Sequence, residues 1–210
     1  ELNQAVHAWG GITLHDVIHN RFAHKAIEKG ADGLIAVAAG AGGHAGTISP
    51  FALVQEIRQW VDGPLALSGA IANGAAVLAA QAMGADFAYM GTRFAATQES
   101  NAPEEYKQLL LSQTTADIVL TERISGVPAS FMRGSIERAG LDPDNLPPLK
   151  APRTPDLPPT FKPWRDAWSA GQGIGMIHDL PTVAELTARL ETEYRDAVAK
   201  VNGATSRFRG

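Results

Sequence analysis

A single ionisable side chain, His44, lies in the middle of a glycine-rich stretch at residues 40–46. An almost unbroken apolar run at residues 32–39 precedes it, which is typical of a strand buried on both faces. Ser49 and Pro50 follow as an expected helix N-cap and first helical residue. A histidine in a glycine loop at the carboxyl end of a buried strand lies where α/β enzymes place a catalytic group. The alternative is that His44 only caps a helix.

Two further turns of small residues come at the ends of the next two predicted strands. They cover residues 68–70 and 90–93. Backbone N–H groups in such turns bind an anion without a lysine, and the last two strand–helix loops of a barrel frequently bind phosphate. The turns therefore predict a phosphorylated ligand, although small residues also occur where a helix packs closely on a sheet. We expect Arg93 to make a structural salt bridge.

The composition argues against several classes of function. The 210 residues include 18 basic and 22 acidic side chains, a net charge of -4, which gives no reason to expect nucleic acid or an anionic membrane as partner. No cysteine is present, so thiolate chemistry is excluded. His15 and His19 would not share a helical face, and we predict no metal site. The sequence shows no signal peptide or apolar membrane span, so we expect a cytoplasmic protein.

The first hundred residues alternate between predicted strands and helices. The segments KAIEKGADGLIAV and LAAQAMGADFAYM repeat one helix–strand pattern 54 positions apart. Alternation of this kind predicts a parallel sheet with helices outside it, either doubly wound or closed as a (β/α)8 barrel. Strands are expected at residues 11–18, 32–39, 64–67 and 87–90, and helices at residues 21–29, 50–60 and 74–83.

The second half of the chain has a different texture. We expect residues 101–210 to pack on the same domain as residues 1–100. Residues 104–111 and 116–120 are expected to be helical or extended. The proline-rich segment at residues 142–163 disfavours long helices and central strands, and predicts an irregular excursion over the surface. A flexible linker is the alternative.

The C-terminal region carries one more glycine-rich loop, at residues 167–175. Trp164 and Trp168 are expected to pack beneath the proline-rich segment rather than to form a stacking platform. Thr182 and Glu185 have the spacing of a capping box, which predicts the start of an amphipathic helix.

Together these loops resemble the nitronate monooxygenase family, formerly called 2-nitropropane dioxygenases. The blocks that carry the resemblance are GAGGHAG, SGAIANG, GADFAYMGTRFAAT, ISGVPASFMRGSIERAGLD and WSAGQGIGMIHDLPTVAEL, which span roughly residues 11–200. The resemblance implies an α/β fold of the (β/α)8 TIM-barrel type that binds FMN. The chain does not begin with Met, and we expect only the C-terminal half of the barrel, strands 5–8, with a C-terminal extension. A longer parent protein or assembly with a partner, such as a homo-oligomer, would then supply the rest.

The resemblance also implies roles for individual residues. His44 matches the catalytic histidine of the family. The expected reaction is oxidation of an alkyl nitronate or nitroalkane by FMN and O2 to a carbonyl compound and nitrite. His44 would act as base on the carbon beside the nitro group or, protonated, would bind the nitronate. The chain has Ser-Gly-Ala where the family often has Gly-Gly. The positions expected to bind the cofactor are Gly42, Gly43, Ser68, Gly69, Ala70, Gly91, Thr92 and Gln172.

Three alternatives stay open from the sequence. A flavin-dependent NAD(P)H:quinone reductase or an FMN-type enoyl-acyl-carrier-protein reductase would reduce the flavin with a nicotinamide cofactor instead. A non-catalytic fragment or interaction module would retain no flavin. A fold resemblance alone does not decide between reactions.

Overall fold

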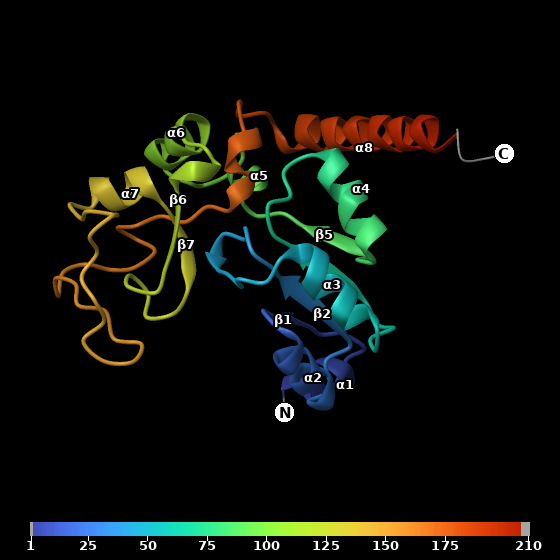
Figure 1. The fold of residues 1–210 in the computed structure, drawn as a ribbon, viewed down its shortest axis with the longest axis horizontal. Helices are drawn as coiled ribbons and strands as arrows, with labels where there is room; N and C mark the ends of the chain where they lie inside the picture. The colour runs from blue at the N-terminus through green and yellow to red at the C-terminus, as the bar shows by residue number, and fades with distance from the viewer. Residues whose placement is uncertain (1, 207–210) are drawn as a thin grey trace.

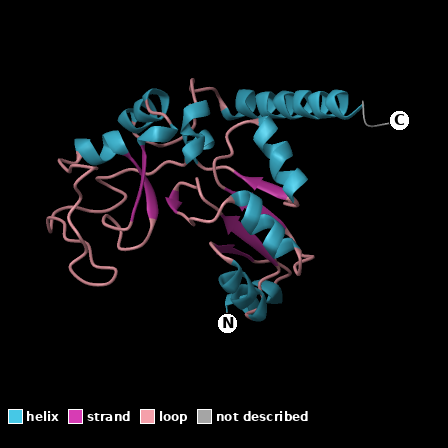
Figure 2. Cartoon of the chain, viewed as in Figure 1, coloured by secondary structure: helices cyan, strands magenta, loops and turns pink. Residues whose placement is uncertain are grey.

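The protein is described here from a computed structural model, which describes residues 2–206. Figures 1 and 2 show a parallel sheet with helices beside it, a smaller sheet next to a long irregular segment, and one long helix that leads to the C-terminus. The elements in chain order are α1 (Leu2–Ala8), β1 (Leu14–Val17), α2 (Asn20–Glu28), β2 (Gly33–Val37), β3 (Gly43–His44), α3 (Pro50–Arg58), β4 (Leu65–Ser68), α4 (Gly74–Met83), β5 (Phe87–Tyr89), α5 (Thr92–Ala95), α6 (Glu104–Ser112), η1 (Thr115–Asp117), β6 (Ile118–Thr121), β7 (Ala129–Met132), α7 (Arg133–Arg138), η2 (Gln172–Met176) and α8 (Val183–Thr205).

The larger sheet has four parallel strands in the order β1-β2-β4-β5. Within this sheet, the order of the strands in space is the same as their order along the chain. The sheet is therefore wound in one direction and lacks the reversal of a doubly wound sheet. Helices α2, α3 and α4 share one hydrophobic core with one face of this sheet. An α/β fold with a parallel sheet, as expected from the alternating pattern, is confirmed.

The core between sheet and helices comes from the inward positions of both. Leu34, Leu65 and Leu67 point from the strands, and Leu53 and Ile57 point from α3; all five are buried. Burial of each such side chain contributes about 1.5–3 kcal/mol relative to leaving it in water. This core fixes the strands, and the ends of the strands fix the loops that follow them.

The opposite face of the sheet carries the alternate residues of the same strands. Phe87 and Tyr89 of β5 lie on this face in register with Ala66 and Ser68. Phe87 is 57% exposed and Tyr89 is 56% exposed, so two large aromatic rings face solvent at the edge of the sheet.

The smaller sheet is antiparallel, with the strand order β3-β7-β6. β3 belongs to the loop after β2, and it pairs with a strand more than 80 residues later through Gly43↔Ser130 and His44↔Ala129. Thus His44 lies in a short strand and not in an unpaired loop, which corrects the expectation from the sequence. The glycines that suggested a loop supply positive φ angles, 91° at Gly40 and 70° at Gly43, which the tight turn into β3 requires.

The expected helices and strands of the first hundred residues are confirmed to within a few residues. Residues 116–120 are resolved as the end of η1 and most of β6, and the proline-rich segment is irregular apart from two isolated bridges, Ala151 with Thr154 and Pro163 with Ala167. The capping box of α8 is present, since Thr182 Oγ1 accepts from Glu185 N at 3.2 Å and Thr182 N donates to Glu185 Oε2 at 2.8 Å. The description of residues 1–100 as the half-barrel and of residues 101–210 as packing on the same domain stays a prediction.

Within residues 2–206, no helix is both long enough and apolar enough to cross a bilayer. The cytoplasmic location stays a prediction from the sequence.

Candidate active site

A small cavity lies at the carboxyl ends of β2, β4 and β5, where the sequence predicted an anion site. Its volume is about 30 Å³, which is room for a few water molecules or for a group of phosphate size. Six of the predicted cofactor residues line it: Gly42, Ser68, Gly69, Ala70, Gly91 and Thr92. The fold therefore brings the three predicted loops together at one point.

Close backbone packing forms one side of this cavity. A Cβ atom added at Gly42 would lie 2.8 Å from the nitrogen of Gly171, and one added at Gly171 would lie 2.6 Å from the carbonyl oxygen of Gly40. Real Cβ atoms do not approach backbone atoms so closely, so these positions require glycine. The wall of the cavity here is main chain, with N–H and C=O groups close to its surface.

Gly91 is different, because a Cβ added there would meet nothing within 4 Å. This residue nevertheless lines the cavity, so the space beside its Cα is part of the space that a ligand would fill. The main chain at Gly91 then runs directly into α5, with Thr92 as its first residue. A bound anion fits this place, since backbone N–H groups at a strand–helix turn attract negative charge.

The turn after β4 has an unusual backbone conformation. Gly69 has φ 148° and Ala70 has φ 55°. A left-handed alanine costs about 1–2 kcal/mol, and such strain is typical of functional turns. Ala70 N donates to Gly40 O at 3.2 Å, which fixes this turn against the loop after β2. The Ser-Gly-Ala sequence therefore adopts a turn that suits two glycines.

Gln172 and Gly43, the other two predicted cofactor residues, do not line the cavity. Gln172 N donates to Gly40 O at 2.8 Å, and its side-chain oxygen lies close to where a Cβ of Gly40 would be, at 3.1 Å. Gln172 thus packs against the loop after β2 at Gly40 and does not reach the cavity. Thr92 has a similar second role, because its Oγ1 accepts from Gly171 N at 2.9 Å.

His44 lies just beyond this cavity. It is two residues from Gly42, so the two Cα atoms are at most about 7 Å apart. The side chain of His44 is exposed, and its ring meets the indole of Trp164 edge to face at a centroid distance of 5.0 Å. The N-cap of α3 is Ser49, so the alternative role of His44 as a cap of that helix is not supported.

The tryptophans differ from the sequence expectation. Trp168 is partly buried, beneath the guanidinium of Arg138 at 3.7 Å, and beside Tyr106. Burial raises the pKa of Tyr106 to about 12, and its hydroxyl donates to Ser169 O at 2.8 Å. Trp164 is 41% exposed and contacts His44, so the prediction that it packs beneath the proline-rich segment was wrong. In the sequence, the only sign of this contact is that Trp164 comes shortly before the glycine-rich loop at residues 167–175.

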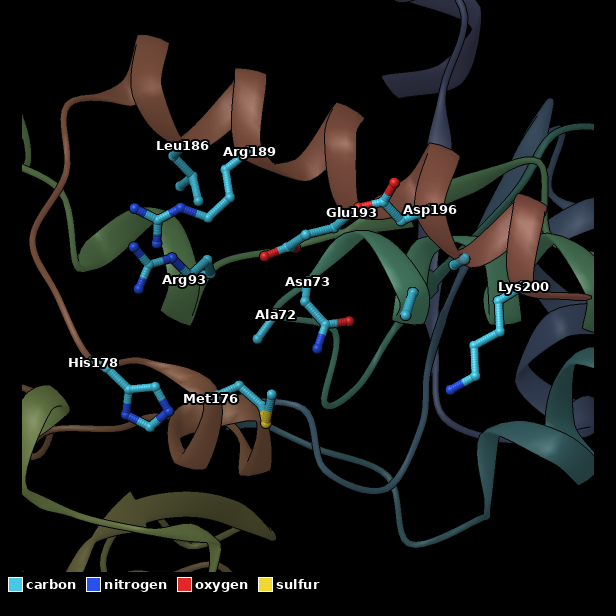
Figure 3. Close-up of a pocket in the computed structure, with 12 residues that line it drawn as sticks. Ala72, Asn73, Arg93, Met176, His178, Leu186, Arg189, Glu193, Asp196 and Lys200 are labelled. Carbon is cyan, nitrogen blue, oxygen red and sulfur yellow. The ribbon is translucent and has the colours of Figure 1, made fainter.

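A larger cavity of about 500 Å³ lies under α8 (Figure 3). Arg93 and Arg189 reach it from α5 and α8, and both bind Asp179, at 3.0 Å and 2.6 Å. Burial lowers the pKa of Arg93, while the Arg189 guanidinium holds the pKa of Asp179 below its usual value. The structural salt bridge expected for Arg93 is confirmed.

We place the candidate site at the smaller cavity for two reasons. It lies at the carboxyl ends of parallel strands, where α/β folds bind ligands, and backbone groups without a fixed counter-charge line it. In the larger cavity, Arg93 and Arg189 already pair with Asp179, and the Glu193 carboxylate extends into it while it accepts from Gly74 N at 2.8 Å.

Comparison with known proteins gives a consistent result. The profile of the family described as "Nitronate monooxygenase" matches residues 6–193. A nitronate monooxygenase of Paraburkholderia phytofirmans is 31% identical over an alignment of 190 residues, and the match covers 82% of this chain and 51% of the relative. The chain spans about half the length of the curated relatives it matches.

Two solved structures have similar folds. A nitroalkane oxidase from Streptomyces ansochromogenes matches 95% of this chain and 62% of its own, with a TM-score of 0.78 and 28% identity. FabK from Thermotoga maritima matches 96% of this chain and 66% of its own, with a TM-score of 0.77 and 25% identity.

Proposed function

The chain belongs to the nitronate monooxygenase family, and we propose that it forms the FMN-binding, catalytic half of an enzyme that oxidises alkyl nitronates or nitroalkanes. The products would be a carbonyl compound and nitrite, with O2 as the oxidant. The observation that carries this proposal is the small backbone-lined cavity, with His44 two residues beyond one of its walls. The P. phytofirmans relative and the nitroalkane oxidase neighbour support the choice of substrate class.

The cavity suits the phosphate of FMN. Its size accommodates that group and not a whole cofactor, so the rest of FMN would extend from it toward His44 and the open face of the sheet. Gly91, Thr92 and the turn at residues 68–70 would surround the phosphate, and the backbone N–H groups of Gly69, Gly91 and Thr92 would bind it, since Ala70 N already donates to Gly40 O. The open space beside Gly91 is the feature of the site that fits this group most directly.

His44 would handle the proton. In a neutral nitroalkane, its imidazole would remove a proton from the carbon beside the nitro group, and it would be protonated in the process. With a nitronate, the protonated ring would bind the anion. Bound FMN would supply the electron transfer, which a histidine side chain cannot provide. Because His44 is exposed and lies near the cavity, a substrate can reach it without a change in the backbone.

We also propose that the parallel sheet is half of a (β/α)8 barrel, equivalent to strands 5–8. The one-directional strand order, the helices on one face and the exposed aromatic rings on the other support this. In a closed barrel, the second face would be the interior. The remaining strands would come from a longer parent chain or from a second copy.

The reductase class is the second candidate, because FabK from T. maritima resembles this chain about as closely as the nitroalkane oxidase does. In that case a nicotinamide cofactor would reduce the flavin. An interaction module without flavin is the candidate from outside the enzymes.

The test of the proposed reaction is nitrite release. The purified protein would be supplied with FMN in aerated buffer and given an alkyl nitronate, with nitrite and O2 uptake measured together. We expect nitrite to appear only when protein, FMN and nitronate are all present. Rates equal to those of FMN alone would overturn the proposal.

A further inference from the structure

Trp164 forms a ring cluster with the candidate base. Its indole meets the His44 ring edge to face, at 5.0 Å between centroids and 90° between planes. We propose that Trp164 is a positioning residue that sets the orientation of the His44 imidazole, and that it forms an apolar wall beside the substrate. This inference rests on the proposed function, in particular on His44 as the base.

The tryptophan itself has a rigid support. A second aromatic ring, that of Phe131, stacks on the indole at 5.0 Å with an interplanar angle of 27°. Phe131 is 0% exposed and belongs to β7, whose Ala129 pairs with His44. Strand pairing therefore fixes the backbone of His44 and the support of Trp164 relative to each other. The indole of Trp164 packs on Phe131 and so has a defined place beside the His44 ring.

The backbone of Trp164 points to the same role. Its φ is 70°, in the left-handed region that a bulky residue rarely adopts. The turn is closed around it, because Asp166 Oδ2 accepts from Lys162 N at 2.7 Å and Asp166 N donates to Lys162 O at 3.0 Å. An unfavourable conformation held by its surroundings is typical of positions where the geometry itself matters.

The consequence for His44 follows from its exposure. A solvent-exposed imidazole samples several rotamers, and only some of them aim a ring nitrogen at a bound substrate. An edge-to-face contact with a fixed aromatic ring favours one rotamer. Trp164 is 41% exposed and its indole contacts that imidazole, so we expect an alkyl chain of a nitro compound to pack against the indole.

The first test does not depend on activity. The protein contains 6 histidines, and the imidazole proton signals of His44 would be assigned by their loss in His44→Asn. The indole shifts these signals through its ring current, so we expect Trp164→Ala to move them and Trp164→Phe to retain part of the shift. Unchanged His44 signals in Trp164→Ala would overturn the positioning role.

A matched control exists within the chain. His24 stacks on Trp60 at 3.7 Å, and this second histidine–tryptophan pair is formed by α2 and the turn after α3; neither residue lines the cavity. Trp60→Ala should move the His24 signals and leave those of His44 in place. Movement of the His24 signals together with those of His44 in Trp164→Ala would indicate a general change of fold and would overturn the inference.

The second test compares two substrates in the flavin-loaded protein. If Trp164 aims the base, Trp164→Ala should lower kcat for a neutral nitroalkane by about 10-fold to 100-fold, and should affect the preformed nitronate much less. Trp164→Phe should restore most of the loss. Equal losses with both substrates would contradict the positioning role. If the unmodified protein oxidises neither, the proposed function fails, and the His44 signals alone decide the inference.

Discussion

Under the proposed function, His44 would supply the chemistry of the candidate site and Gly91 would contribute to binding. His44 has an exposed ionisable ring two residues along the chain from Gly42, which lines the cavity, and Gly91 offers space and main chain within the cavity. A substitution at one should therefore leave the task of the other intact. This separation makes the two residues a useful pair for experiment.

Replacement of His44 by asparagine should abolish base catalysis without loss of the cofactor. We expect His44→Asn to retain FMN and to lose about 100-fold or more of the turnover of a neutral nitroalkane, because an amide cannot accept the proton. Retained flavin is measured by absorbance after gel filtration, and turnover by nitrite release. His24→Asn, on the outer helix α2, is the control that should keep full activity. Full turnover in His44→Asn would exclude the base assignment.

Replacement of Gly91 by valine should act on binding instead. A branched side chain would occupy the space beside Gly91 that the phosphate would need, so FMN retention should fall by about 10-fold or more, equal to about 1.4 kcal/mol. Flavin fluorescence titration measures this. Gly203→Val is the matched control, since a Cβ there also meets nothing within 4 Å but lies on α8. Equal affinity in Gly91→Val and the control would count against the phosphate site.

Two aspartates at equivalent positions of the sequence repeat fix the strands that carry these loops. Asp32 Oδ2 accepts from Thr13 N at 2.6 Å, just before β1, and Asp86 Oδ2 accepts from Leu65 N at 2.8 Å, at the start of β4. These are the two aspartates of the repeat found in the sequence, 54 positions apart. Each one joins the beginning of its own strand to the beginning of a parallel neighbour.

Asp86 gives a prediction for stability against pH. The hydrogen bond from Leu65 N and the Arg58 guanidinium keep the pKa of Asp86 below its usual 3.8. A carboxyl with a lowered folded pKa stabilises the fold above its unfolded pKa, and the contribution disappears as the pH falls through the folded pKa. We expect Asp86→Asn to lower the unfolding free energy by about 1 kcal/mol at pH 7, given its partial exposure, and to flatten its decline below about pH 5.

Urea unfolding at several pH values measures this effect. Asp62→Asn removes an exposed carboxyl from the neighbouring loop and serves as the control, which should keep the decline of the original chain. An Asp86→Asn protein as stable as the original at pH 7 would contradict the anchoring role.

The sequence predicts the elements of the parallel sheet because their signals are local. A buried strand, a glycine C-cap such as Gly84 with φ 111°, and an N-cap such as Asn73, which accepts from Ala76 N at 2.8 Å, all lie within a few residues. β3 and β7 were missed because β3 has two residues and gains its identity from a partner far along the chain. Pairing over that distance leaves little trace in a single sequence.

In the candidate site too, the sequence predicts the local features and misses those that depend on long-range contacts. The loops that line the cavity were predicted from glycines at strand ends, and the fold brings them together. The supporting place of Gln172 and the contact of Trp164 with His44 depend on tertiary packing, so they became visible only in the structure. Which residues bind FMN stays a prediction for all of them.

At the scale of the molecule, β5 exposes two aromatic side chains on the sheet face away from the helices. Phe87 and Tyr89 lie on an edge strand, where unpaired backbone groups and apolar side chains favour pairing with another chain. Under the half-barrel proposal, this face would meet the remaining strands or a second copy. The 210-residue chain should therefore associate through it.

Phe87→Ser should weaken that association. The side chain is 57% exposed, so we expect the unfolding free energy of the monomer to change by no more than about 0.5 kcal/mol, while the share of dimers and larger species falls. Sedimentation velocity measures both species. Phe51→Ser, at a 65% exposed position on α3, is the control that should leave association unchanged. An equal effect of both substitutions would contradict association through the sheet face.

The most direct test of the whole account is the visible absorption spectrum of the purified protein under nitrogen, with additions of a nitronate and then of NADH. We predict flavin bands that bleach on addition of the nitronate and return when air is admitted. Bleaching by NADH alone would contradict the nitronate reaction and favour the reductase. A protein that retains no flavin, even after FMN is supplied, would contradict the cofactor site itself.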